Sequence, residues 1–319
     1  MTMILVGDVR ARLAQIASES ISCIVTSPPY FGLRDYGCDG QIGLEATPDA
    51  YIAELVAVFR EARRALRSDG TLWLNLGDSY AAGPSGRVNP DKWPKQASSR
   101  GTTENEIRAV SKSFGLANKQ RLMIPARVAL ALQADGWWLR DEIIWHKPNP
   151  MPVSVTDRTT PAHEMLYMFS KSARYHYDME AVKEPAAHPS VTRRSSKKAD
   201  GAESAFLGNA PTNLGRCGTA ADGMRQPRSV WSIPTRPFKG AHFATFPPDL
   251  VRPCIKAGCP AGGTVLDPFF GAGTTGLVAA ELGRNCMGIE LNPEYARIAA
   301  ERLGLRALTP DALIMGRAA

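Results

Sequence analysis

Long apolar runs are absent from this chain of 319 residues. The longest aliphatic stretches, such as residues 128–132, are far shorter than the roughly 20 residues that a helix needs to cross a bilayer. The N-terminus also lacks the charged and then apolar pattern of a secretory signal peptide. We therefore expect a soluble cytoplasmic protein with no membrane partner.

Paired cysteines are missing as well. The six cysteines include no Cys-x-x-Cys pair, and Cys23 and Cys286 lie inside strand-like apolar runs. Reduced thiols in a hydrophobic core fit this pattern better than ligands or bridges do. The sequence therefore predicts no metal site and no disulfide framework.

Acidic residues are scarce in two stretches of the chain. Residues 84–121 hold eight Lys and Arg against three acids, and residues 187–230 hold seven against three. The net charge of the whole chain is +7, so the remainder is slightly negative. This distribution favours a polyanionic partner bound by loops on a near-neutral scaffold. Two solvated loops without a partner are the alternative.

The stretch Thr26-Ser27-Pro28-Pro29-Tyr30 directly follows a buried, strand-like run. Its prolines stiffen the turn and remove two N–H donors. What remains is a set of acceptors, the Ser27 hydroxyl and the carbonyls of residues 27 and 28, beside the ring of Tyr30 as a stacking face. Such a pocket suits a planar group that carries an amino group, such as a nucleobase. A Pro-Pro turn that merely ends a strand is the alternative.

A second landmark is the turn at residues 267–275, which joins a short strand to a helix. Its glycines let the backbone approach a ligand closely. The next strand ends in Glu290, 23 residues after Asp267, where a carboxylate can accept hydrogen bonds from both hydroxyls of a ribose. The phosphate-cradling Gly-x-Gly-x-x-Gly pattern is absent, and Asp267 would repel a phosphate. S-adenosylmethionine is the natural candidate ligand, with Asp267 near its ammonium group.

Both landmarks resemble motifs of the amino-methylating DNA methyltransferases of bacterial restriction–modification systems. Residues 27–30 match the catalytic (S/D/N)PP(Y/F) motif, residues 267–274 match the cofactor motif DPFxGxGT, and their order resembles the permuted β group. The resemblance implies that Asp8 reaches the adenine end of the cofactor, although this residue could simply cap the following helix. The implied catalytic residues are Ser27, Pro28, Pro29 and Tyr30, and the implied cofactor-binding residues are Asp8, Thr26, Phe246, Asp267, Phe269, Gly271, Gly273, Thr274 and Glu290.

Strands and helices alternate along the chain, which favours a mainly parallel, doubly wound α/β sheet. The resemblance implies seven strands, with the strand at residues 165–170 antiparallel to its neighbours. We expect a hairpin between residues 165–170 and 174–178, and a helix that starts at Thr47-Pro48 and stops at residues 68–70. Residues 1–182 form the catalytic half with the basic insert 84–121, residues 183–230 a target-recognition insert, and residues 231–319 the half that binds S-adenosylmethionine.

The expected reaction moves a methyl group from S-adenosylmethionine to the exocyclic amino group of a base that is flipped out of double-stranded DNA. Ser-Pro-Pro-Tyr is typical of the cytosine N4 enzymes, so the predicted product is N4-methylcytosine, with N6-methyladenine as the alternative. The residues expected to contact DNA are Lys147, Asn149, Arg193, Arg194, Lys197 and Lys198.

Two rival functions stay open. One is methylation of an amino or amide group on RNA or on a protein glutamine, and the other is DNA binding by a protein that has lost catalysis. The basic stretches favour nucleic acid over protein, and the intact motifs argue against lost catalysis. A cognate restriction endonuclease and a second copy of this chain are candidate partners.

Overall fold

The computed structural model describes residues 1–81, 116–117, 119–186, 223–236, 246–309 and 312–314. Its internal contacts divide the chain into two compact units, one of Met1–Asp178 with Ser229–Ala319 and one of Met179–Arg228. Most of both basic stretches lies outside the described residues. Within the described part of the chain, no helix combines the length and the apolar character that crossing a membrane requires.

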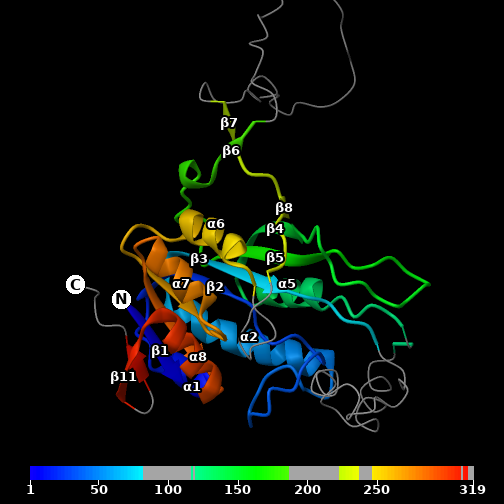
Figure 1. Ribbon diagram of the computed structural model, residues 1–319, viewed down its shortest axis with the longest axis horizontal. Coiled ribbons are helices and arrows are strands. Elements are labelled where there is room, and N and C mark those ends of the chain that lie inside the picture. The colour runs from blue at the N-terminus through cyan, green and yellow to red at the C-terminus, as the bar shows by residue number, and fades with distance from the viewer. Residues whose placement is uncertain (82–115, 118, 187–222, 237–245, 310–311, 315–319) are drawn as a thin grey trace, which may run out of the picture. The chain divides into compact units, whose positions relative to one another are not determined.

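The larger unit is built on a mixed sheet of ten strands (Figure 1). Its seven central strands, in spatial order, are β1 (Thr2–Val6), β10 (Asn285–Glu290), β9 (Thr264–Asp267), β2 (Ile21–Thr26), β3 (Leu66–Leu76), β5 (His163–Ser170) and β4 (Trp138–His146). The first five are mutually parallel, whereas β5 runs antiparallel to both β3 and β4. The predicted mainly parallel α/β sheet with its inserted antiparallel strand is confirmed.

Three short strands extend the sheet beyond the predicted seven. A hairpin of β11 (Arg306–Thr309) and β12 (Ala312–Ile314) pairs with β1 at one edge, and β8 (Val230–Ser232) pairs with β4 at the other. These strands have three or four residues each, too few to show an alternating apolar pattern. The number of strands is therefore larger than the sequence predicted.

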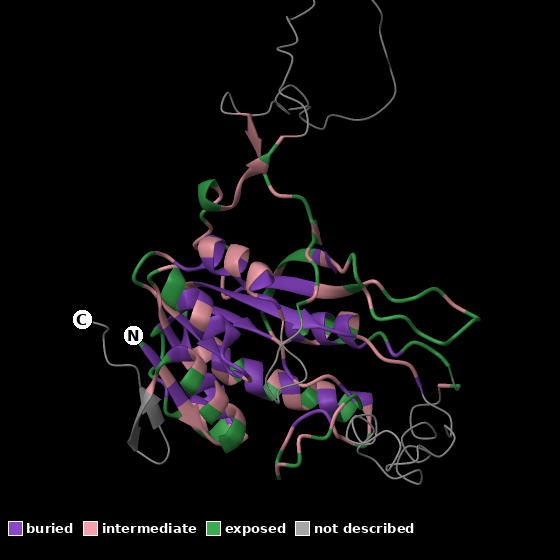
Figure 2. Ribbon diagram, in the orientation of Figure 1, coloured by how far each residue is buried: buried purple, intermediate pink, exposed green. Residues whose placement is uncertain are grey.

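Helices cover both faces of the sheet. Helices α1 (Val9–Ala14), α2 (Pro48–Ala65) and α5 (Ile124–Ala134) form one set, and α6 (Pro248–Gly258), α7 (Thr274–Glu281) and α8 (Pro293–Leu303) form another. Successive side chains of a strand point to opposite faces. Leu72 of β3 belongs to the core beneath α2, whereas Trp73 faces Gly258 of α6. Figure 2 shows the buried residues concentrated in these central strands.

Helix α2 begins as the sequence predicted. The Thr47 hydroxyl accepts a hydrogen bond from the Ala50 amide (3.0 Å), and Pro48 occupies the first turn. The predicted stop at residues 68–70 is too late, because the helix ends at Ala65 and β3 begins directly at Leu66.

The predicted hairpin after β5 is wrong, since residues 174–178 form no strand. The reason is that β3 and β4 already occupy the two edges of β5. The segment instead continues across the ends of other elements, where His176 donates its amide to the Asp69 carbonyl (2.8 Å).

The smaller unit, Met179–Arg228, contains the 3-10 helix η2 (Glu180–Val182) and a two-stranded ribbon of β6 (Glu184–Pro185) and β7 (Met224–Arg225) in its described residues. Glu184 forms ion pairs with Arg225 and Arg228, each at 3.0 Å. Residues 187–222 lie outside the described part, so the recognition role of this insert stays a prediction.

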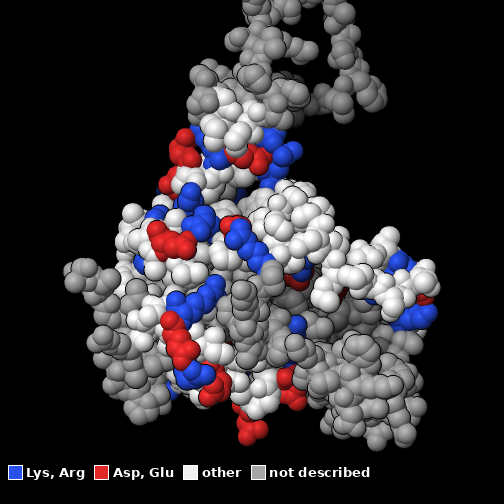
Figure 3. All heavy atoms as spheres, viewed as in Figure 1, with Lys and Arg blue, Asp and Glu red and all other residues white. Residues whose placement is uncertain are grey.

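Positive and negative side chains are interspersed among the described residues on the face of the molecule that Figure 3 shows. Many of them pair with each other, as Arg252 does with Glu281 (2.7 Å) and Arg236 with Asp249 (2.5 Å).

Candidate functional site

The two motif loops meet at the middle of the sheet, although they are far apart in the chain. Strands β2 and β9 are neighbours, so their carboxyl ends lie at the same edge. There the Thr26 hydroxyl donates a hydrogen bond to Asp267 Oδ1 at 2.6 Å, across 241 residues of sequence. A cavity of about 990 Å³ opens beside this contact. Ligands of open α/β sheets bind at such strand ends.

The cavity gathers most of the residues that the sequence singled out. Those that line it are Asp8, Ser27, Pro28, Pro29, Tyr30, Lys147, Asn149, Phe246, Asp267, Phe269, Gly271, Thr274 and Glu290. Thr26 and Gly273 do not line it, and Arg193, Arg194, Lys197 and Lys198 lie outside the described residues.

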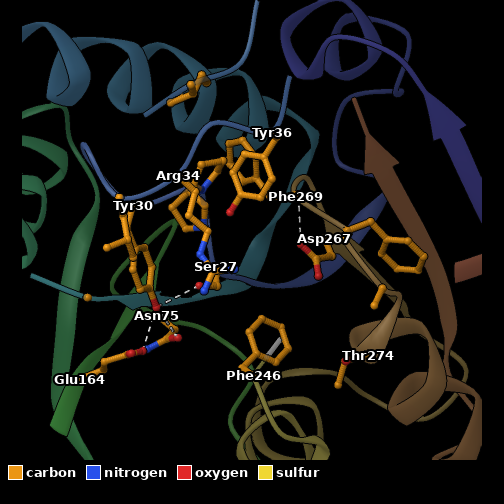
Figure 4. Close-up of a pocket in the computed structure, with 18 of the residues that line it drawn as sticks. Ser27, Tyr30, Arg34, Tyr36, Asn75, Glu164, Phe246, Asp267, Phe269 and Thr274 are labelled. Atoms are coloured by element: carbon orange, nitrogen blue, oxygen red, sulfur yellow. Dashed lines mark hydrogen bonds between the residues drawn. The ribbon is translucent and has the colours of Figure 1, made fainter. Parts of the chain in front are cut away.

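The catalytic turn is held by its tyrosine. The Tyr30 hydroxyl lies 3.2 Å from Ser27 Oγ, 3.0 Å from Asn75 Oδ1 and 2.8 Å from Glu164 Oε2 (Figure 4). The ring packs against Gly77, where an added Cβ would come within 2.5 Å of a ring carbon. The part of the Tyr30 ring that packs against Gly77 is therefore not available for stacking on a ligand.

The prolines of the turn are fixed from helix α2. The Tyr51 hydroxyl donates a hydrogen bond to the Pro29 carbonyl at 2.8 Å, and Tyr51 itself is fully buried. This contact consumes the carbonyl of residue 29. The carbonyls that we predicted as acceptors for an amino group are those of residues 27 and 28, which this contact does not involve.

In and around the second loop, glycines make room for other side chains of the protein. Phe270 is 3% exposed and packs against Gly276 of α7 and Gly288 of β10, where a Cβ would come within 2.7 and 2.3 Å of its ring. Gly273 has a φ of 75°, and a Cβ there would face Ala299 of α8. These positions seat the loop on the core, and the cavity is lined by Gly271 instead.

Asp267 is almost fully buried and accepts three hydrogen bonds. Besides Thr26, its carboxylate accepts from the Thr275 hydroxyl (2.6 Å) and the Phe269 amide (3.1 Å). Burial raises the pKa of this carboxyl to about 6, against the lowering effect of the two hydroxyl groups. The carboxylate therefore ties β2 to α7 and also lines the cavity, and its contact with an ammonium group stays a prediction.

Glu290 ends strand β10 and is 9% exposed. One carboxylate oxygen accepts from the Gly271 amide (2.7 Å) and the other from the Asn292 amide (2.9 Å). Burial raises the pKa of Glu290 to about 7. Each oxygen keeps a further lone pair, so this group can still accept hydrogen bonds from a diol.

Asp8 caps helix α1, accepting from the amides of Arg10 (2.9 Å) and Ala11 (3.2 Å), and pairs with the Arg10 guanidinium (2.7 Å). The capping role that the sequence left open is thus present. Asp8 also lines the cavity, so its contact with a ligand stays a prediction.

Two residues predicted to contact DNA have protein partners. The Lys147 ammonium pairs with Glu164 and lies 4.4 Å from the centre of the Trp145 ring. Asn149 exchanges two hydrogen bonds with the backbone of Thr235, at 3.1 and 2.9 Å. Both side chains shape the cavity wall, and their contact with DNA stays a prediction.

Sequence reasoning missed several cavity residues. Asn75 interrupts the otherwise apolar end of β3 and is 2% exposed. A lone amide inside a buried run is a signal for a polar partner. Glu164 lies near the start of β5, and because that strand is antiparallel, its beginning lies at the edge where the parallel strands end. Two further wall residues, Tyr36 and Tyr295, stand edge to face at 6.2 Å between ring centres.

Comparison with known proteins identifies relatives of this chain in sequence and in fold. The N6/N4 methyltransferase family, described as DNA methylase, matches residues 21–301. Type II methyltransferase M.XycI of Xanthomonas campestris pv. cyanopsidis is 46% identical over 301 residues, which cover 93% of this chain and 86% of that protein. M.SmaI of Serratia marcescens is 46% identical over 304 residues, covering 94% and 90%.

Solved structures agree with this fold. PvuII DNA methyltransferase (cytosine-N4-specific) superimposes with a TM-score of 0.63 at 18% identity, covering 97% of this chain and 88% of that one. TTHA0409, a putative DNA modification methylase of Thermus thermophilus complexed with S-adenosyl-L-methionine, gives 0.58 at 25% identity, with 95% and 93% covered. The chain therefore belongs to the N6/N4 DNA methylase family of S-adenosylmethionine-dependent enzymes, as its two motifs predicted.

Proposed function

We propose that this DNA methyltransferase methylates the exocyclic N4 amino group of cytosine in double-stranded DNA. The observation that carries the proposal is the position of Ser27, whose hydroxyl lies in the same cavity as the cofactor loop. The Ser-Pro-Pro-Tyr tetrad and the cytosine-N4-specific enzyme among the similar folds support cytosine as the target. The order of the two motifs supports placement in the permuted β group.

The cavity wall offers a fitting site for S-adenosylmethionine. Glu290 would accept hydrogen bonds from the ribose, Asp267 would face the ammonium group, and Phe246 and Phe269 would flank the cofactor. When bound, the cofactor supplies an electrophilic methyl group on a sulfonium. The near-complete burial of both carboxylates strengthens their attraction to donors and cations, because the local dielectric is low.

The same cavity extends to the face where a base would enter. Ser27 and the adjoining carbonyls would accept hydrogen bonds from the amino group, and the Tyr30 ring would pack against the base. Met151, which is 84% exposed, and Val153 also line the cavity. Since the amino group of a paired base is inaccessible, the base must be flipped out, at a cost of a few kcal/mol.

A nucleophilic cysteine is not needed for this chemistry, and the described site offers none at the turn. The chain contains one Pro-Cys pair, but Cys254 lies fully buried inside α6 and is not part of the cavity wall. Its burial raises the pKa of the thiol, which disfavours the reactive thiolate. Direct attack by the amino nitrogen is therefore the proposed route.

The experiment that tests this function is a product assay. The protein is incubated with labelled S-adenosylmethionine and DNA of mixed sequence, and the DNA is digested to nucleosides for mass spectrometry. N4-methylcytosine is the expected product. N6-methyladenine alone would overturn the choice of base, and label transferred to RNA or protein but not to DNA would overturn the substrate.

The partners and the cellular location of the enzyme are also proposals. A restriction endonuclease that cuts the same DNA sequence would be the partner in a restriction–modification system, as the type II relatives suggest. A homodimer and a cytoplasmic location also stay proposals. Phosphate contacts would come from the cluster at residues 193–198, through charges that make DNA binding weaken as salt rises.

Glu290 predicts how cofactor affinity depends on pH. Its pKa is raised to about 7 in the folded protein, and ribose hydroxyls donate to the ionised form, so cofactor binding should lower that pKa and release protons. Affinity is expected to rise between about pH 6 and 8 and then level off. Glu290→Gln should bind more weakly and lose the part of this rise near pH 7, keeping only the part near pH 6 that ionisation of Asp267 produces. Calorimetry in buffers of different ionisation enthalpy measures both effects, and an unchanged rise in the variant would contradict the assignment.

A further inference from the structure

The Tyr30 hydroxyl stands at the centre of a polar cluster that joins the catalytic turn to strands β3 and β5. Its three neighbours are Glu164 at 2.8 Å, Asn75 at 3.0 Å and Ser27 at 3.2 Å (Figure 4). A phenol can donate one proton and accept at its oxygen. The direction of each hydrogen bond in the cluster therefore depends on which neighbours of the Tyr30 hydroxyl can donate a proton.

Two of the three neighbours are acceptors. The side-chain amide of Asn75 donates from Nδ2 to the Met165 carbonyl at 3.1 Å, which leaves Oδ1 facing Tyr30. Glu164 presents a carboxylate oxygen, and its other oxygen pairs with the Lys147 ammonium. Neither Asn75 Oδ1 nor the carboxylate can give Tyr30 a proton.

The third neighbour must therefore be the donor. Burial, followed by the nearby charge of Glu164, raises the pKa of Tyr30 well above its usual value, so the phenol keeps its single proton. That proton goes to the acceptors, and the Tyr30 oxygen is left to accept from the Ser27 hydroxyl. The lone pairs of Ser27 Oγ are then free for the cavity.

We propose that Glu164 is a positioning and specificity-determining residue that, through Tyr30, holds the Ser27 hydroxyl as a hydrogen-bond acceptor toward the target base. The inference rests on the proposed function, because the acceptor is meant for an exocyclic amino group. A serine with a freely rotating hydroxyl would accept from an amino group or donate to a carbonyl equally well. A serine locked as an acceptor matches the amino group of cytosine and opposes the carbonyl that thymine carries at the same ring position.

Glu164→Gln tests this directly, since the amide can donate to the Tyr30 oxygen and so compete with the Ser27 hydroxyl for it, while Asn75 Oδ1 still accepts the Tyr30 proton. Turnover is expected to fall about 100-fold, in line with the loss of one preorganised polar contact, with little change in cofactor affinity. Binding should also change, in a measurement that needs no catalysis. With duplexes carrying cytosine or thymine at the methylated position, the preference for cytosine should shrink about 10-fold.

The matched control is Glu142→Gln. Glu142 of β4 faces Tyr167 of β5, and burial, followed by the charge and the hydrogen bond of Glu142, raises the pKa of Tyr167. Neither residue lines the cavity. This variant makes the same chemical change in a comparable Glu–Tyr pair, so turnover and the preference for cytosine should both stay at wild-type values.

Tyr30→Phe separates the inference from a structural effect of Glu164. It removes the hydroxyl that relays the direction and leaves the Glu164–Lys147 pair intact, so it should shrink the preference for cytosine by the same factor. Combining it with Glu164→Gln should add nothing. An undiminished preference in either single variant, or additive losses in the double variant, would overturn the inference. The proposed function would survive that result, because it fails on a different observation, namely the wrong product in the nucleoside assay.

Discussion

Replacing Ser27 by alanine is expected to lower turnover by about 10²- to 10³-fold, the range seen when one preorganised polar contact of a reaction centre is removed. The hydroxyl is the side-chain acceptor of the catalytic turn and lies 3.2 Å from Tyr30. Cofactor and DNA binding should be nearly unchanged, because the Pro28 carbonyl and the Tyr30 ring remain. Single-turnover kinetics with labelled cofactor, alongside binding isotherms, measure the two properties separately.

Ser20→Ala is the matched control for this variant. The Ser20 hydroxyl donates one hydrogen bond to the Ala17 carbonyl (2.7 Å) in an exposed turn before β2. Loss of this hydrogen bond should lower the free energy of unfolding by about 1 kcal/mol or less and leave turnover unchanged. Full activity in Ser27→Ala would mean that the backbone carbonyls alone hold the amino group, and the proposed role of Ser27 would fail.

The central fold could be predicted because its signals are local. The buried run before Ser27 and the strand before Asp267 are short, apolar and bounded by turn residues, which is how parallel strands look in sequence. Their adjacency followed from the motifs, whose chemistry requires the two loops to meet. The edge strand β8 and the end of α2 were missed because pairing with a neighbour, rather than the chain's own pattern, decides them.

The residues of other strands that hydrogen-bond to the catalytic turn could not be predicted from local patterns. Glu164 reaches Tyr30 across 134 residues of sequence, and β5 begins at the active edge only because it is inserted antiparallel. The glycines in and next to the cofactor loop were recognised in the sequence, but their role was predicted only in part. They indicated a backbone open to a ligand, whereas at Gly273, and at Gly276 in the first turn of α7, the missing side chains make room for the core.

Replacing Asp267 by alanine is expected to abolish cofactor binding and to destabilise the fold by about 3 kcal/mol, since buried donors left without partners cost about 1–3 kcal/mol each. The Thr26 hydroxyl and the Phe269 amide would lose their acceptor, and the Thr275 hydroxyl would keep only a long contact with the Val25 carbonyl (3.5 Å). These contacts join the end of β2, the cofactor loop and α7, so the walls of the cavity should loosen together. Chemical denaturation and cofactor calorimetry measure the two losses.

Asp267→Asn separates the charge from this bracing role. The pKa of Asp267 is raised to about 6 in the folded protein, above its unfolded value of about 3.9, so the wild-type carboxyl costs stability progressively as pH rises from about 4 to 6. The neutral amide removes that cost and can still accept from Thr26, so Asp267→Asn should be about as stable as the wild type at neutral pH. Its cofactor affinity should nevertheless fall at least about 10-fold, because the ammonium group loses its counter-charge. Wild-type affinity in Asp267→Asn, together with lost stability in Asp267→Ala, would show that the carboxylate serves as a brace and leaves the ammonium to another residue.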